Sequence, residues 1–348
     1  MDANKQPISI SITIGTIIKA ILIFLVLYFL FLIQEVLAIL FVAIILSSAV
    51  DPWVDWMHKF KIPRSVGILF IYLVMFSVIA LAIYLIIPPI ATEISELANN
   101  FPRYAEKIIS TFSTLKNYSI EHGILDQVKN SLGTVSANLQ AAAGGIFTTV
   151  TGIFGGIFSF FLILMLTFYM VVEENAIKKL VWSIAPEKHQ VYVMQLINRI
   201  QKKIGLWLRG QLILCLVIFV LSYIGLLILG VKYALMLALI ASITELVPYI
   251  GPIIGAIPAV VLAFAQSPIL AVFVVALYYG IQLVENNILT PKIMEKAVGI
   301  NPIISIVALL VGFKVAGVVG AILSIPVATA VSVFVKDVFD SKGEKKDM

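Results

Sequence analysis

Long apolar runs, separated by short polar segments, make up most of this chain. A helix needs about 20 apolar residues to cross the hydrocarbon core of a bilayer. By that criterion we expect six full spans, at residues 12–33, 36–50, 66–87, 146–172, 211–229 and 268–285. Two further apolar stretches, 233–265 and 302–335, are interrupted by glycine and proline. The pattern therefore predicts an all-α polytopic membrane protein.

The composition supports this fold class. Of the 348 residues, 61% are hydrophobic and 12% are charged, whereas soluble domains carry about 25% charged residues. A soluble fold of this length would expose large apolar patches, and lipid removes that difficulty. The net charge of +5 is small and lies in the loops. It indicates membrane topology rather than nucleic-acid binding.

The positive charges predict an orientation. Segment 173–210 carries seven basic residues against three acidic ones, and the loop 51–64 is also basic, whereas segment 88–145 has four basic residues and five acidic ones. Because basic loops stay on the cytoplasmic side, we expect the first two inside and the third outside. Both termini, including the lysine-rich tail 336–348, are then cytoplasmic.

Two polar segments show helical periodicity. Within 88–145, apolar residues recur every three or four positions, which indicates extracytoplasmic amphipathic helices, with Asn100 and Pro102 marking a restart. Segment 173–210 has the pattern of a cytoplasmic helix lying at the interface. Residues 1–87 then hold spans one to three, residues 146–172 hold span four, and residues 211–335 form the remaining core.

The two broken stretches resemble each other. If Gly230 is placed against Gly299, Gly251 meets Gly320 without a gap. The predicted topology makes 233–265 begin outside and 302–335 begin inside. Each stretch is then a re-entrant helical hairpin, and the pair forms an inverted repeat, which recurs in secondary transporters.

The hairpin tips would expose unpaired backbone groups, which lipid does not satisfy and which protein or a wet cavity must cover. Half-helix ends there supply partial charges for a polar solute or ion. Ordinary kinks in spanning helices are the alternative interpretation. The helix-breaking residues are Pro248, Gly251, Pro252, Gly255, Pro258, Gly312, Gly317, Gly320 and Pro326.

Five polar residues at membrane depth are candidates for a transport path. Glu245 and Lys314 lie near the expected tips, where a charge costs about 2.5–3.5 kcal/mol on insertion scales. They pair across the repeat, line a polar path, or extend to a nearby interface. Gln282, Glu285 and Asn286 share one helical face and form either a solute or proton site or a polar helix end.

Several chemistries have no support in the sequence. It has no phosphate-binding loop of the form G-x-x-x-x-G-K-[ST] and no H-E-x-x-H motif. His58, His122 and His189 are isolated, and Cys215 is the single cysteine. We therefore expect no metal, no cofactor and no enzymatic activity, and we expect an ion or solute gradient to supply the energy.

Four stretches together resemble a known family. They are DPWVDWMHKFKIPRSVGI, WLRGQ, LVPYIGPIIGAIPAV and QLVENNILTPKIMEKAVGINPIISIVALLVGFKVAGVVGAILSIPVATAV. They are similar to the autoinducer-2 exporter family, also described as PerM-like permeases, over about residues 12–337. The resemblance implies a transporter of the bacterial cytoplasmic membrane. It also implies a homo-oligomer, with a pentamer as one candidate.

Three functions follow as hypotheses. The first is a permease that exports a small polar solute such as the quorum-sensing signal autoinducer-2. The second is a Na⁺(Li⁺)/H⁺ antiporter in which Glu245 or Glu285 carries the proton. The resemblance implies this possibility, since some members of the family are described as such antiporters. The third is a non-transporting membrane scaffold built on the external helices.

Overall fold

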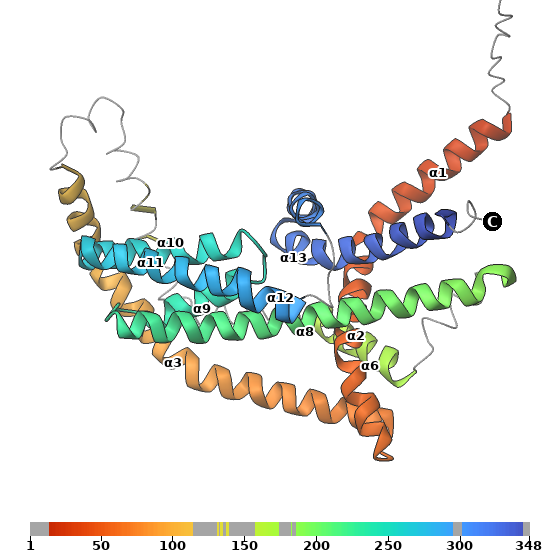
Figure 1. The fold of residues 1–348 in the computed structure, drawn as a ribbon, viewed down its shortest axis with the longest axis horizontal. Coiled ribbons are helices and arrows are strands. Elements are labelled where there is room, and N and C mark those ends of the chain that lie inside the picture. Colours follow the sequence, from red (N-terminus) through yellow and green to blue (C-terminus); the bar gives the residue numbers. More distant parts are fainter. Residues whose placement is uncertain are drawn as a thin grey trace, which may run out of the picture.

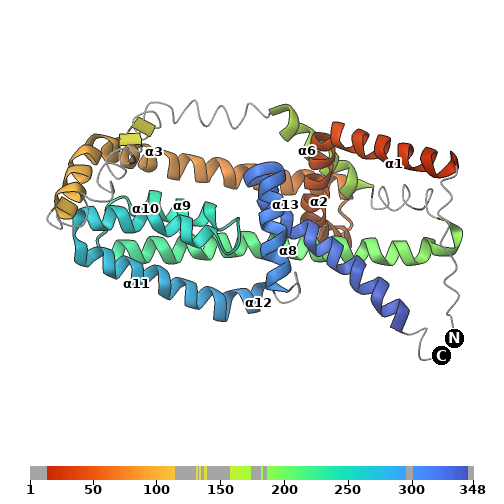
Figure 2. The same ribbon diagram turned by 90° about the horizontal axis from the view of Figure 1, so that it is seen from above.

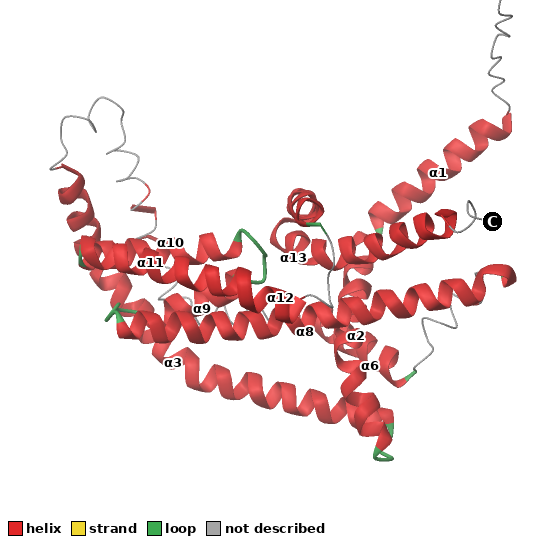
Figure 3. Ribbon diagram, in the orientation of Figure 1, coloured by secondary structure: helices red, strands yellow, loops and turns green. Residues whose placement is uncertain are grey.

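The secondary structure of the described residues is helical, as the apolar runs of the chain predict (Figures 1 and 3). The computed structural model describes residues 14–113, 157–173, 186–294 and 301–343, with a few isolated positions between them. No strand occurs in these ranges. The longer helices are α1 (Ile14–Leu32), α2 (Gln34–Lys59), α3 (Arg64–Ser113), α6 (Ile157–Val172), α8 (Gln190–Ile228), α9 (Ala234–Thr244), α10 (Gly251–Gln266), α11 (Pro268–Val284) and α13 (Pro302–Gly343).

Five segments of the described chain are long and apolar enough to cross a membrane. They are Gln34–Lys59, Arg64–Lys107, Gln190–Ile228, Pro268–Met294 and Pro302–Asp337. Leucine, isoleucine, valine and phenylalanine side chains cover their outer surfaces. Water disfavours so much exposed apolar area, so this surface suits lipid. The protein is therefore an integral membrane protein, while the number of full spans stays a prediction.

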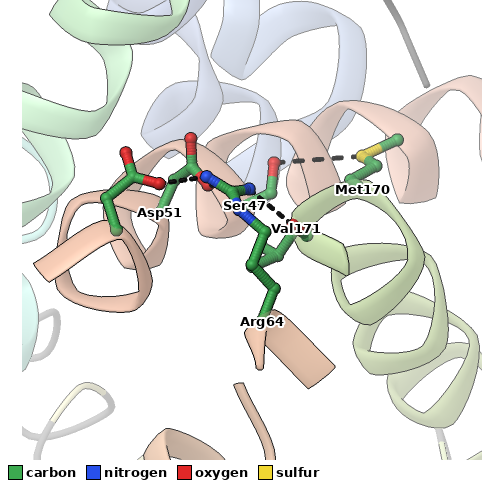
Figure 4. Close-up of polar contacts among 6 residues, drawn as sticks. Ser47, Asp51, Arg64, Met170 and Val171 are labelled. Carbon is green, nitrogen blue, oxygen red and sulfur yellow. Dashed lines mark hydrogen bonds and ion pairs between the residues drawn. The ribbon is translucent and has the colours of Figure 1, made fainter. Parts of the chain in front are cut away.

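The start of α3 is anchored on its neighbours by one arginine. Arg64 forms ion pairs with Asp51 and Asp55 of α2, and it donates a 2.8 Å hydrogen bond to the carbonyl of Val171 in α6 (Figure 4). This carbonyl lies in the last turn of α6, where backbone acceptors lack helical partners. Beneath these contacts, Val54, Ile68 and Val171 form a buried cluster.

Helix α3 is longer than expected. The predicted restart at Asn100 and Pro102 is wrong, because α3 continues through both residues to Ser113. Packing explains the continuity, since Leu97 and Phe101 are buried in the main hydrophobic cluster, which also contains residues of α9 and α10. Tertiary contacts thus outweigh the cost of proline inside the helix. Most of the expected external segment, 114–145, lies outside the described residues.

Helix α8 is also continuous. Residues 190–210, expected in a separate interfacial helix, form its first half, and the apolar second half follows without a break (Figure 1). No proline interrupts the segment, and Gly205 lets α8 approach α2 closely. A Cβ at this position would collide with the carbonyl of Ser48. The rest of the expected interfacial segment lies largely outside the described residues.

Helices α9 and α10 form the first hairpin, residues 234–266. Helix α9 ends at Thr244, a turn follows over residues 245–250, and α10 begins at Gly251 with Pro252 in its first turn. The two arms touch near this turn. A Cβ at Gly251 would collide with the carbonyl of Thr244, and one at Gly255 would lie 2.8 Å from the Cα of Ala241. Glycine therefore permits the close contact of the arms.

Helix α13 is a second hairpin, because its chain reverses at Ala316 and Gly317 (Figure 2). Gly317 has φ of +58°, in the left-handed region that favours glycine. Gly312 lies before the bend and Gly320 after it. The two face each other so closely that a Cβ on either would collide with the carbonyl of the other. The sequence alignment paired Gly320 with Gly251, and both glycines lie where two arms meet. Re-entry into the bilayer and the inverted repeat stay predictions.

Candidate functional site

A cavity of about 580 Å³ lies where α8, the first hairpin, the end of α11 and the second hairpin meet. Residues of α8, of both hairpins and of the segment that ends α11 line the cavity. Its lining combines polar and apolar side chains, namely Trp207, Gln211, Leu214, Glu245, Pro248, Tyr249, Ile253, Gln282, Glu285, Asn286, Thr290, Pro291, Met294, Pro302, Ser305 and Ile325. We call it the central cavity.

Glu245 occupies the position where α9 ends. The residue is only 2% exposed, and its backbone carbonyl accepts a 2.6 Å hydrogen bond from Nε2 of Gln211 in α8. Pro248, three residues later, has no N–H for a continuing helix, so the chain leaves the helical path here. The buried amide of Gln211 replaces the partner that this helix-end carbonyl would otherwise lack.

Glu285 begins a π-helical turn, η3 (Glu285–Leu289), which follows α11 directly. Such turns inside helices are frequent at functional sites. Nε2 of Gln282 lies 3.3 Å from Oε2 of Glu285 and 3.3 Å from Oδ1 of Asn286. The three residues expected on one helical face therefore do lie together, and all three line the central cavity.

The two carboxyl groups of the cavity belong to Glu245 and Glu285, and both residues are buried. Two carboxyl groups that share a buried site do not both ionise readily, because like charges disfavour each other. Oε2 of Glu245 is buried and has no hydrogen-bond partner in the described chain. Burying an acceptor without a hydrogen-bond partner costs free energy. Binding a proton, a cation or a solute hydroxyl at this oxygen would remove that cost.

No basic side chain neutralises this pair, because no lysine, arginine or histidine lines the cavity within the described ranges. Lys314, which we considered as a partner for Glu245, is exposed near the reversal of α13 and is not among the lining residues. The two residues form no ion pair in the structure. The cavity thus favours neutral or positively charged guests over anions.

Several polar residues of the cavity were not predicted from the sequence. Gln211, Thr290 and Ser305 add an amide and two hydroxyl groups to its lining. Gln211 carried a usable signal, since it is a polar residue inside the WLRGQ motif at the start of an apolar run. No sequence pattern indicates that Thr290 or Ser305 belongs to a polar site.

The helix-breaking residues shape the cavity more than they line it. Of the nine, only Pro248 lies in the wall. Gly251, Gly255, Gly312 and Gly320 bring helical arms together, while Gly317 makes the reversal of α13. Pro252 lies in the first turn of α10, and Pro258 and Pro326 lie inside helices.

The oxygen-rich lining suits a hard monovalent cation better than a transition metal. Within the described residues there is no group of three or more histidine, cysteine, aspartate or glutamate side chains that would hold a metal ion. Cys215 is buried within α8. The side chains of the lining offer hydrogen-bond donors, acceptors and two carboxyl groups.

Comparison with known proteins identifies the family of this chain. YrrI of Bacillus subtilis (strain 168) is 31% identical over 302 residues, which cover 84% of this chain and 83% of that protein. The AI-2 transport protein TqsA of Escherichia coli (strain K12) is 25% identical, with 84% and 82% covered. A sodium-lithium/proton antiporter of Halobacillus andaensis is 24% identical, with 82% and 84% covered. The AI-2E family transporter pattern matches residues 17–340, and the chain belongs to this transporter family.

Proposed function

We propose that this protein is a secondary transporter that exports a small, uncharged polar solute, such as autoinducer-2, through the central cavity. The observation that carries the proposal is the buried pair of Glu245 and Glu285 in a cavity without a basic lining residue in the described chain. Its volume of about 580 Å³ lies within the range of small-molecule sites, roughly 300–1,000 Å³.

The lining suits a solute that carries several hydroxyl groups. The side chains of Gln211, Gln282 and Asn286 offer both donors and acceptors, and the carboxyl pair accepts or shares protons. Apolar lining residues such as Leu214 and Ile253 offer contact to the carbon skeleton of such a solute. The name of the relative TqsA refers to autoinducer-2, which is a solute of this class.

Both hairpins border the cavity, so their relative movement would change access to it. Glu245 and Pro248 come from the first hairpin, while Ser305 and Ile325 come from the second. We propose that the hairpins enter the membrane from opposite sides and that their movement exposes the cavity alternately. We place the protein in the cytoplasmic membrane as a homo-oligomer, with both termini inside.

Cation/proton antiport is the second candidate, and the unpartnered Oε2 of Glu245 favours it. A carboxyl pair that shares a proton can exchange that proton for Na⁺ or Li⁺ when the cavity opens to the other side. The relative from Halobacillus andaensis is named as a sodium-lithium/proton antiporter. In this case transport would depend steeply on pH.

Reconstituted liposomes distinguish the two candidates. Wild type is compared with Glu245→Gln and Glu285→Gln, while Glu35→Gln, an exposed carboxylate on α2, serves as the control. For solute export, we expect autoinducer-2 flux that both cavity variants reduce and the control retains. For antiport, Na⁺ addition changes the internal pH, and both cavity variants abolish that response.

Two results would contradict the proposal. If folded Glu245→Gln and Glu285→Gln proteins transport as fast as wild type, the central cavity is not the path. If wild type transports neither a polar solute nor cations above empty vesicles, the scaffold hypothesis gains support. Substitutions of Leu97 and Phe101, which join α3 to the first hairpin, should then impair function more than cavity substitutions do.

A further inference from the structure

A second polar cavity, of about 420 Å³, lies between α2, α6 and α8, and the proposed transport path does not use it. We call it the α2–α8 cavity. Its wall consists of Ser47, Ser48, Asp51, Pro52, Met170, Asn198, Gln201, Lys202, Leu206 and Arg209. It shares no lining residue with the central cavity. The WLRGQ motif serves both cavities, since Arg209 lines this one and Gln211 lines the other.

Unused hydrogen-bond donors gather in this cavity. Lys202 and the side-chain amides of Asn198 and Gln201 form no hydrogen bond or ion pair with another described residue. Arg209 uses only Nε, which donates 3.0 Å to the carbonyl of Gly205, so its two terminal NH₂ groups stay available. Four side chains therefore offer N–H donors, and two of them are cations.

The carboxylate and the hydroxyl groups of the cavity are already engaged, which leaves the amide oxygens of Asn198 and Gln201 as its free acceptors. Asp51 is paired with Arg64 at 3.3 Å, which offsets its negative charge. The hydroxyl groups of Ser47 and Ser48 both donate to the carbonyl of Ile44, at 3.0 and 2.7 Å. The cavity thus has an excess of donors and positive charge, which is the chemistry of an anion site.

The aromatic residues beside the cavity are typical of a position near a membrane surface. Pro52 belongs to the wall, and Trp53 and Trp56, which follow it on α2, are 61% and 58% exposed. Exposed tryptophans concentrate at the level of the lipid headgroups. Basic pockets between helices at this level recognise anionic headgroups.

We propose that the α2–α8 cavity binds a phosphate ester of net negative charge, with Lys202 and Arg209 as its cationic contacts and Asn198 and Gln201 as neutral donors. Two sources share this chemistry, namely the headgroup of an anionic phospholipid and a soluble phosphate ester. All four contacts belong to α8, and the site lies beside Gly205, where α8 packs closely against Ser48 of α2.

Binding to the full-length protein in nanodiscs tests this site. Nanodiscs of phosphatidylcholine are compared with nanodiscs containing phosphatidylglycerol, and retained lipid is counted by native mass spectrometry. In a second arm, glycerol 3-phosphate is titrated into the phosphatidylcholine nanodiscs and the thermal unfolding midpoint is followed. Retention of phosphatidylglycerol alone identifies the lipid source, and a rise of the midpoint with glycerol 3-phosphate identifies the soluble source.

The double variant Lys202→Gln/Arg209→Gln removes both cationic contacts. Each lost charge should weaken binding by about fivefold, since a basic residue near an anionic surface contributes about that factor. The control Lys59→Gln/Lys203→Gln removes the same charge from two residues outside the cavity lining and should bind normally. The single variant Arg209→Lys keeps the positive charge. It should therefore fold normally and retain most of the binding of wild type.

Two outcomes overturn the proposal. In the first, wild type shows no preference for phosphatidylglycerol and no response to glycerol 3-phosphate. In the second, the double variant binds as tightly as wild type, or the control loses as much affinity as the double variant. In that second case the attraction comes from the overall surface charge and not from this cavity.

Discussion

Nε2 of Gln211 donates a hydrogen bond of 2.6 Å to the backbone carbonyl of Glu245. This contact joins the middle of α8 to the end of α9, two segments that are 34 positions apart. It fixes the backbone of Glu245 while leaving Oε2 of the same residue unpartnered in the described chain. The carboxyl group is therefore held in place by its main chain and stays chemically available.

Replacing Gln211 by leucine should destabilise the protein. The change leaves a buried carbonyl without a donor, which costs about 1–3 kcal/mol. We expect a lower thermal unfolding midpoint and slower transport, because Glu245 loses its support. Gln34→Leu, at an exposed position in the first turn of α2, is the matched control. An unchanged midpoint in Gln211→Leu would show that the contact does not hold the turn.

The bend of α13 should not tolerate a methyl group where its arms meet. In Gly320→Ala the new Cβ would collide with the carbonyl of Gly312 and lie 2.9 Å from the Cβ of Ala316. Because neighbouring backbone must move, we expect a lower unfolding midpoint and reduced transport. Gly280→Ala, in α11, meets no atom within 4 Å and should be neutral or slightly stabilising, since alanine favours helix. Equal behaviour of the two variants argues against close packing of these arms in the membrane.

The features that the sequence revealed are local ones. Glycine and proline mark the two chain reversals because their backbone preferences act within a few residues. Gln282, Glu285 and Asn286 were expected on one face because helical spacing alone places them there. The all-helical fold and the family were predicted correctly for the same reason, since long apolar runs and contiguous motifs need no knowledge of tertiary contacts.

The features that the sequence did not reveal depend on contacts between distant segments. The bond between Gln211 and Glu245 has no local signal. Lys314 carries a charge complementary to Glu245, yet sequence cannot tell which side of the second hairpin faces the cavity. Helix α3 passes through Pro102 because the buried Leu97 and Phe101 before it and the partly buried Tyr104 and Ala105 after it pack in the main hydrophobic cluster. A rule about proline does not include such packing.

Arg64 should be sensitive to the shape of its side chain as well as to its charge. Arg64→Gln removes the ion pairs with Asp51 and Asp55 and the hydrogen bond to the carbonyl of Val171. Hydrogen bonds to charged groups contribute about 1.5–3 kcal/mol, so we expect a clear loss of stability in detergent. Arg64→Lys keeps the charge but lacks the planar guanidinium group. Its stability should lie between those of wild type and Arg64→Gln. Lys61→Gln, in the preceding turn, is the control, and a loss of the same size there would remove the case for Arg64.

Glu93 should stabilise the first turn of α9 from outside the hairpin. Its Oε2 accepts a 2.8 Å hydrogen bond from the backbone N–H of Met236, at a helix end where free N–H groups and the helix dipole both favour a carboxylate. Replacing such a cap by alanine costs about 0.5–2 kcal/mol. We expect Glu93→Ala to speed amide hydrogen exchange at Met236 and Leu237. Glu93→Gln keeps an acceptor oxygen and should lose only part of the protection.

Glu96→Ala, one turn further along α3 and exposed, provides the comparison for Glu93.

Near the other end of the hairpin, Nζ of Lys107 donates a 2.7 Å hydrogen bond to the carbonyl of Gln266, the last residue of α10. Helix α3 therefore contacts the start of α9 with a negative charge and the end of α10 with a positive one, which suits both helix dipoles. If the hairpin moves as a unit with α3, Glu93→Ala should also change the transport rate while leaving solute affinity unaltered. Unchanged exchange and unchanged rates would mean that α3 only rests against the hairpin.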